Sequence, residues 1–177
     1  MTAEEFTKKI ADLKPTHKEI AELNYSDDFK AYFLKEFDIK QISYEDHDDP
    51  VISLLKNYDL TSFRANDISF DSSVQEDDEY LFIGWDISGD RLAIFKQSGR
   101  IVSYYPYSEA ITFQCAENTS KFLDALFEIM KFSKEKMFRN YEENDLNDRS
   151  EKVAYITALC AGGEQYEDYY KSVLSVE

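Results

Sequence analysis

The first forty residues show the three-to-four-residue spacing of hydrophobic positions that is typical of amphipathic helices. Thr2 with Glu5, and Thr16 with Glu19, have the spacing of a capping box, in which hydroxyl and carboxylate satisfy free amides of a first helical turn. Ser26 is placed to cap a third helix. The hydrophobic residues on one side of each of these three helices should contact the core. These residues are Phe6, Ile10, Leu13, Ile20, Leu23, Phe29, Tyr32, Phe33 and Phe37.

A polar segment follows, in which Asp49 before Pro50 predicts the start of a short helix. From about Ala65 the period changes to alternation, which is typical of strands. The predicted strands are one that contains Ile68 and Phe70 and four that cover residues 80–85, 91–97, 100–105 and 110–114. Gly89 and Gly99 lie in the turns between them, and Pro106 ends the fourth strand or places it at an edge. The pattern predicts an antiparallel meander of about five strands.

The remaining hydrophobic pattern returns to helical spacing. Asn118 and its neighbours offer caps for a helix that carries Phe122, Leu123, Leu126, Phe127 and Met130 and packs on the sheet. The segment 131–148 is charged, with a few apolar positions. A further helix carries Val153, Ile156 and Leu159 and ends at Gly162-Gly163, and a final short helix carries Tyr166, Tyr169, Tyr170 and Leu174. The fold class is therefore α+β.

Composition agrees with one folded domain. The chain has 177 residues, of which 43% are hydrophobic and 15% aromatic, and no Gly/Ser-rich or Pro-rich run separates two units. Cys115 and Cys160 are far apart and lack C-x-x-C spacing, which favours a reducing compartment. The N-terminal residues do not have the pattern of a signal peptide, and no stretch has the length of a membrane span. We expect a cytoplasmic protein that does not enter a membrane.

The charge balance bears on the partner. With 36 acidic and 20 basic side chains, the formal net charge is −16. This charge repels nucleic acid and anionic membranes on average and favours a positively charged partner. Alternatively, the surplus of acids serves only to keep the protein soluble.

The motifs of catalysis and metal binding are missing. Asp86 and Asp90 lie four residues apart around a turn, and a carboxylate- or metal-dependent enzyme would use such a pair, but a turn-forming role is the simpler interpretation. His17 lies at a helix start, His47 in an acidic loop, and Cys115 at the end of an apolar strand, so no nucleophile has a nearby base. Phosphate-loop, dinucleotide, hydrolase and zinc-protease motifs are also missing. We therefore predict no catalytic residues, no metal site and no cofactor.

An acidic run, Glu76-Asp77-Asp78-Glu79, stands directly before the strand that begins at Tyr80. Four like charges repel one another, and a basic partner that docked there would relieve the repulsion. The alternative is a gatekeeper role, in which charges beside a hydrophobic strand suppress aggregation. The two interpretations are compatible.

Three short motifs follow one another along the chain, IGWDISGDRL at residues 83–92, SGRIV at 98–102 and SKFL at 120–123. In this order they resemble the motifs of the SUKH superfamily of immunity and scaffold proteins. In that family a strand ending in Gly-x-Asp is followed by a Gly-Asp turn, a return strand, a second Gly turn, another strand and a helix. The resemblance covers about residues 80–130, and it implies a SUKH-like core over about residues 1–132 with a helical C-terminal extension over 133–177.

The resemblance implies a non-enzymatic protein, most often a bacterial immunity protein that binds and neutralises a cognate toxin such as a nuclease or deaminase. Other members of the family are cytoplasmic scaffolds or regulators, which is the alternative function. A basic toxin would suit the acidic chain, and tyrosine and tryptophan are favoured anchors in interfaces. The candidate partner-binding residues are Glu76, Asp77, Asp78, Glu79, Trp85, Asp86, Asp90, Tyr104, Tyr105 and Tyr107.

Overall fold

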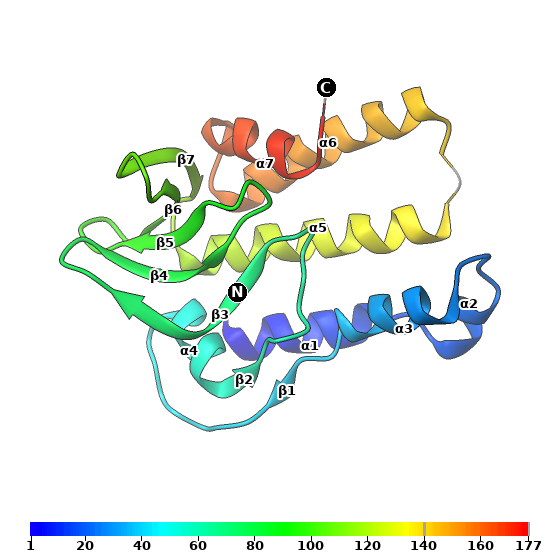
Figure 1. The fold of residues 1–177 in the computed structure, drawn as a ribbon, viewed down its shortest axis with the longest axis horizontal. Helices are drawn as coiled ribbons and strands as arrows, with labels where there is room; N and C mark the ends of the chain where they lie inside the picture. Colours follow the sequence, from blue (N-terminus) through cyan, green and yellow to red (C-terminus); the bar gives the residue numbers. More distant parts are fainter. Residues whose placement is uncertain (140, 177) are drawn as a thin grey trace.

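The computed structural model describes residues 1–139 and 141–176, and its central element is a five-stranded antiparallel sheet (Figure 1). The strands follow one another in the order β3-β4-β5-β6-β7, so the predicted meander is confirmed. Their bounds are Ser69–Glu76, Tyr80–Trp85, Arg91–Phe95, Arg100–Tyr105 and Ala110–Ala116. A second, two-stranded antiparallel sheet pairs β1 (Lys40–Gln41) with β2 (Tyr58–Asp59).

The turns of the meander follow the sequence signals. Gly89 and Gly99 have φ values of +80° and +72°, a backbone region that glycine enters without a steric penalty. Gly84 has a different role, because a Cβ at this position would lie 2.0 Å from the carbonyl oxygen of Ser69 on the neighbouring strand. The lack of a side chain at Gly84 therefore permits the close approach of β3 and β4.

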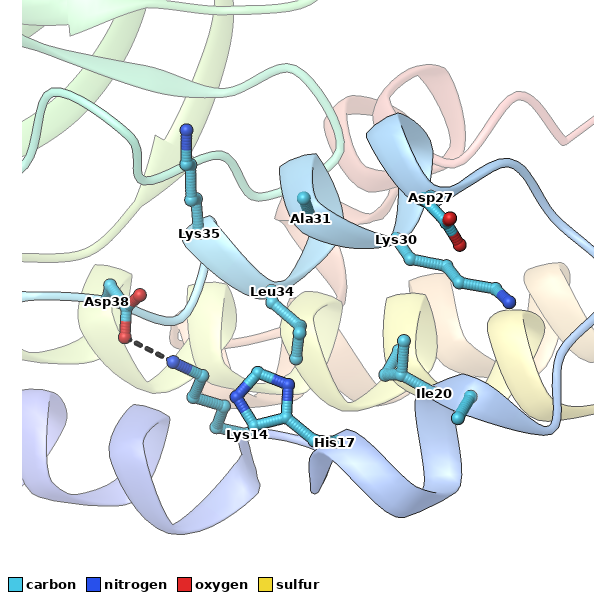
Figure 2. A pocket seen from close by; sticks show the side chains of 10 residues that line it. Lys14, His17, Ile20, Asp27, Lys30, Ala31, Leu34, Lys35 and Asp38 are labelled. Carbon is cyan, nitrogen blue, oxygen red and sulfur yellow. Dashed lines mark hydrogen bonds and ion pairs between the residues drawn. The ribbon is translucent and has the colours of Figure 1, made fainter.

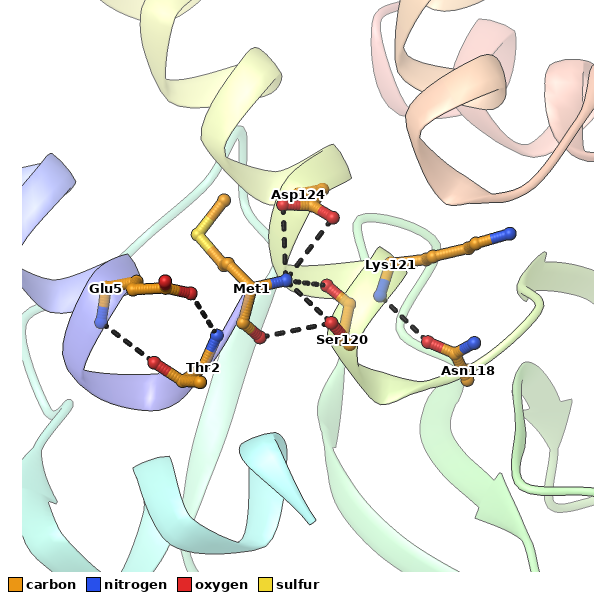
Figure 3. Close-up of polar contacts among 7 residues, drawn as sticks. All are labelled: Met1, Thr2, Glu5, Asn118, Ser120, Lys121 and Asp124. Carbon is orange, nitrogen blue, oxygen red and sulfur yellow. Dashed lines mark hydrogen bonds and ion pairs between the residues drawn. The ribbon is translucent and has the colours of Figure 1, made fainter. Parts of the chain in front are cut away.

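The N-terminal helices begin at the caps that the sequence predicts. The helices are α1 (Ala3–Leu13), α2 (His17–Ala21), α3 (Asp27–Lys35) and α4 (Pro50–Asn57). Both capping boxes form, and the carboxylate of Asp49 accepts the amides of Val51 and Ile52 at the start of α4. The amino group of Met1 donates to the side chains of Ser120 and Asp124, which ties α1 to the start of the longest helix (Figure 3).

The C-terminal half is more helical than the hydrophobic pattern indicates. α5 (Thr119–Phe138) and α6 (Glu143–Ala161) together take up most of the charged segment 131–148, and η1 (Glu164–Tyr166) and α7 (Glu167–Val173) follow. Charged residues of this segment favour helix and pair along and between the helices, as Glu135 does with Arg139 and Arg149. α6 ends at Gly162, which has a φ of +125°.

The helices share one main core with one face of the sheet. α1, α5 and α6 run side by side behind the strands (Figure 1). The expected boundary between residues 132 and 133 falls inside α5, and the C-terminal helices contribute Tyr166, Tyr169 and Tyr170 to the same core. The hydroxyl of Tyr170 donates to the carbonyl oxygen of Cys115 at 2.8 Å, which links α7 to β7. The C-terminal extension is therefore part of the domain's core.

One expectation about this core is wrong. Phe29 and Tyr32 of α3 are 44% and 56% exposed, although the helical stripe predicts core contacts. α3 lies at the rim of the helical layer (Figure 1) and buries only the side that carries Phe33 and Leu34. Among the described residues, no helix has both the length and the apolar character that a membrane crossing requires.

Candidate functional site

The two faces of the main sheet carry separate hydrophobic clusters. Ile83, Leu92 and Ile101 point into the main core under the helices. Tyr80, Ala93 and Val102 form a second cluster on the opposite face, with Phe82, Phe95 and Tyr104 packed against it. All described members of this cluster come from β4, β5 and β6, so no described helix takes part in it. We call the surface made by Tyr80, Phe82, Trp85, Arg91, Phe95 and Tyr104 the aromatic face.

The rings of the aromatic face form a continuous layer. The ring of Tyr80 contacts three others, with centroids 5.0 Å from Tyr104, 5.4 Å from Phe95 and 6.0 Å from Phe82. The register of the strands produces this arrangement, because Tyr80 is opposite Phe95. The layer covers Ala93 and Val102, which are 0% and 2% exposed. Since the rings already contact one another, little side-chain entropy would be lost when a partner binds.

Trp85 and Arg91 extend this layer toward the β4–β5 turn. The guanidinium carbon of Arg91 lies 4.5 Å from the ring centroid of Trp85 and 4.9 Å from that of Phe82. Asp71 on β3 accepts hydrogen bonds from both Arg91 Nη2, at 2.7 Å, and Trp85 Nε1, at 3.0 Å. Trp85 nevertheless remains 40% exposed. The indole is thus held in place and still presents its surface to solvent.

The acidic run covers the last residue of β3 and the β3–β4 hairpin loop. Asp77 shapes the loop, because its carboxylate accepts the backbone amides of Glu79 and Tyr80 at 2.9 and 2.7 Å. Lys96 donates to Glu76 at 2.9 Å. All four acids are exposed and lie beside Tyr80, and burial together with the charge of Glu79 raises the pKa of Tyr80. The acidic run therefore borders one end of the aromatic face.

Tyr105 and Tyr107 lie at the other end of the sheet, beside the β6–β7 turn. They are 42% and 90% exposed, and their ring centroids are 5.5 Å apart. The six residues of β4 extend over about 17 Å at strand spacing, and they separate this tyrosine pair from the acidic run. The structure thus places the acidic run and the tyrosine pair at opposite ends of the sheet, and the alternation of side chains along β6 puts Tyr104 and Tyr105 on different faces.

Asp86 and Asp90 have the turn-forming role that the sequence favours. Asp86 accepts the backbone amides of Ser88 and Asp90 at 2.9 and 3.0 Å, and the hydroxyl of Ser103 donates to it at 2.6 Å. The hydroxyl of Thr112 donates to Asp90 at 2.7 Å. Burial raises the pKa of Asp86, and the hydrogen bond from Ser103 opposes that rise. Because the two side chains are only 6% and 7% exposed, they offer little surface to a partner.

The described residues provide little else for chemistry. Among residues 1–139 and 141–176, no three His, Cys, Asp or Glu side chains gather in a way that would hold a metal ion. Burial raises the pKa of the Cys115 thiol well above its usual value, which makes it a poor nucleophile. A hollow of about 520 Å³ lies between α1, α2 and α3 (Figure 2), but its lining mixes lysines with aspartates, and Lys14 already pairs with Asp38 at 2.5 Å.

The candidate set lacked four residues of the aromatic face, namely Tyr80, Phe82, Arg91 and Phe95, and it also lacked Asp71, which holds Arg91 and Trp85 in place. A signal was present, because β4, β5 and β6 carry apolar residues at both sets of alternating positions, as Phe82 and Ile83 show. Helices that pack on one face leave the other set without cover. Comparison with family models, with curated proteins and with solved structures gave no match.

Proposed function

We propose that this chain is a non-enzymatic protein that binds a basic protein partner through its aromatic face. The observation that carries the proposal is the layer of tyrosine, phenylalanine and tryptophan rings on a sheet face to which no described helix contributes. Aromatic residues and arginine are enriched in protein interfaces, and anchors of this kind dominate binding energies. A preformed layer lowers the entropic cost of association.

Charge supports a basic partner. The net charge is −16, and the acidic run borders the aromatic face at its Tyr80 end. Like charges exposed at the border of an apolar patch attract an oppositely charged surface and speed its encounter. The same charges repel nucleic acid and anionic lipid. The proposed partner is therefore a protein with a basic surface.

The class of protein that we propose is an immunity protein of the SUKH type, which neutralises a cognate toxin in the cytoplasm by direct binding. The order of strand, Gly-Asp turn, return strand, Gly turn, strand and helix over residues 83–123 supports it. Both cysteines are free, which is compatible with a reducing compartment. A scaffold of the same fold is the alternative, and it would be found without a toxin gene beside its own.

The test is co-expression with a toxin encoded by the adjacent gene, scored by growth and followed by calorimetry on the purified pair. Trp85→Ala and Tyr104→Ala should abolish rescue and raise the Kd about 30-fold, which corresponds to about 2 kcal/mol for an interface anchor. Tyr44→Ala is the matched control, since Tyr44 is 88% exposed and lies in the loop before α4. Full rescue by both face variants would contradict the proposal.

A further inference from the structure

A second surface feature lies at the edge of the main sheet, in a hollow of about 170 Å³ between β2 and β3. Its lining is mainly apolar and comprises Ile42, Leu55, Tyr58, Leu60 and Phe70. Leu55, Leu60 and Phe70 are buried, whereas Ile42 is 66% exposed and so lies at the rim. We call this surface feature the β2–β3 hollow.

The two carboxylates at the hollow, those of Asp59 and Asp71, already have partners within the chain. Asp59 accepts the backbone amide and the hydroxyl of Thr61 at 3.0 and 2.7 Å. Asp71 accepts hydrogen bonds from Arg91 and Trp85. The chemistry that the hollow offers to a ligand is therefore that of its apolar lining, and a hydrocarbon group that fills it gains transfer free energy and packing contacts.

β3 is irregular where it borders the hollow. It is an edge strand of the main sheet, and its register against β4 shifts between Phe70 and Gln75. Asp71 and Ser72, which line the hollow, lie in this irregular segment. Irregularities of this kind re-aim side chains and are common at sheet edges beside binding sites.

Asp71 connects the hollow with the aromatic face. It lines the hollow, and its carboxylate also holds the Arg91 guanidinium and the Trp85 indole nitrogen. A partner that covers Trp85 therefore lies next to the hollow, and one of its side chains can enter the hollow from the same interface. Apolar anchors that fill such pockets contribute a large share of binding energy.

We infer that the basic partner proposed above places one apolar side chain, between leucine and phenylalanine in size, in the β2–β3 hollow. The inference rests on the proposed function and adds a determinant of specificity to it. The volume sets the size, because a cavity of about 150 Å³ takes up one benzene molecule. The acidic run then attracts the partner, and the hollow selects a partner that has an apolar residue at this one position.

The first experiment uses the protein alone and toluene, which has the structure of the phenylalanine side chain, in an NMR titration followed through the methyl groups of Ile42, Leu55 and Leu60. Saturable shifts are expected. Ser72→Phe should abolish them, because its ring occupies the hollow, and Ile42→Ala should weaken toluene binding by removing part of the rim.

Ser73→Phe is the matched control for toluene, since Ser73 is also an exposed serine of β3 but does not line the hollow. It should bind toluene like the wild type. A lack of saturable shifts in the wild type would overturn the inference. Unchanged toluene affinity in both Ser72→Phe and Ile42→Ala would overturn it as well.

Calorimetry on the purified pair with the toxin of the adjacent gene extends the test to the partner. Ser72→Phe should raise the Kd about tenfold, the loss of one apolar anchor, and Tyr44→Ala should leave it unchanged. If Trp85→Ala and Tyr104→Ala weaken binding but Ser72→Phe does not, the aromatic face stands and this inference is overturned. Wild-type affinity of both face variants would overturn the proposed function, and this inference with it.

Discussion

Asp71 holds Arg91 against the face of the Trp85 indole, through a 2.7 Å ion pair to the guanidinium and a 3.0 Å hydrogen bond from the indole nitrogen. The Arg91 side chain is 14% exposed and that of Asp71 is 22% exposed, so this ion pair lies largely out of water. Trp85 is the only tryptophan in the chain. Its fluorescence therefore reports directly on this part of the aromatic face.

We predict that Asp71→Ala destabilises the protein by about 1–3 kcal/mol, because it leaves a largely buried guanidinium without its counter-charge. Urea unfolding followed by Trp85 fluorescence measures the loss, and the emission of the folded variant should also shift. Asp78→Ala is the control, since Asp78 is an exposed acid in the adjacent hairpin loop. Equal unfolding midpoints for the two variants would refute the role of Asp71.

The acidic run gives a kinetic prediction for the proposed partner. Changing Glu76 and Glu79 to Gln and Asp77 and Asp78 to Asn should slow association with a basic toxin and weaken its dependence on salt. The amide oxygen that replaces the Asp77 carboxylate in this variant can still accept the loop hydrogen bonds, so the hairpin should persist. Stopped-flow association at several salt concentrations is the measurement, and an unchanged rate would assign the run to solubility alone.

The close approach at Gly84 gives a prediction for the fold. Gly84→Ala would place a Cβ 2.0 Å from the Ser69 carbonyl oxygen, so β3 must move away from β4. We expect a loss of about 3 kcal/mol or more, at the upper end for overpacking. Gly99→Ala is the comparison, because a Cβ there meets no atom within 4 Å and only the positive φ is unfavourable. That variant should lose about 1 kcal/mol, and equal losses would argue against the strand contact.

The sequence predicts those parts of the fold that depend on local chemistry. Thr2, Asp49 and Asn118 cap helices because a side-chain oxygen and a nearby amide suffice, and the Gly89 turn depends on one backbone angle. The length of α5 beyond Met130 was not predicted, because its last turns carry mostly charged residues and only a few apolar ones, such as the buried Phe132. Helix propensity and ion pairs help to hold these turns, but they do not produce a periodic pattern of hydrophobic positions in the sequence.

The candidate site was predicted in part for a similar reason. Trp85 and Tyr104 are recognisable as possible anchors by residue type, but Tyr80 and Phe95 contact each other only through the register of β4 and β5. The exposure of Phe29 was also unexpected, because helical spacing gives a stripe and does not show whether another element covers it. Tertiary packing decides both points.

The ion pair between α5 and α6 gives a prediction at acid pH. Glu135 accepts two hydrogen bonds from Arg149, at 2.9 and 2.8 Å, and this contact lowers the pKa of Glu135 to about 2. The folded pKa is below the usual value of 4.5, so the stabilisation is complete above about pH 4.5 and is lost as the pH falls toward 2. Glu135→Gln should therefore cost about 1 kcal/mol at pH 7.

Urea unfolding at pH 7 and pH 3 measures the effect of Glu135→Gln. The difference from the wild type should be smaller at pH 3, where the wild-type protein has already lost part of the contribution. Glu22→Gln, at an exposed site on the end of α2, should match the wild type at both pH values. A difference that stays constant with pH would show that ionisation of Glu135 is not its cause.

Glu36 gives the opposite pH dependence, because burial and Asp67 raise its folded pKa to about 7, above the usual value of 4.5. The folded state then binds more protons than the unfolded state between these values, so stability falls as the pH rises from about 4.5 to 7 and is constant above. Glu36→Gln cannot ionise and should be more stable than the wild type at pH 8, by about 1 kcal/mol for a half-buried group. The advantage should be much smaller at pH 5.

The pKa of Asp86 is also raised, but Asp86 is present in both proteins, so its effect on stability cancels in the comparison. An equal advantage at both pH values would mean that the variant acts through packing instead of through the charge of Glu36.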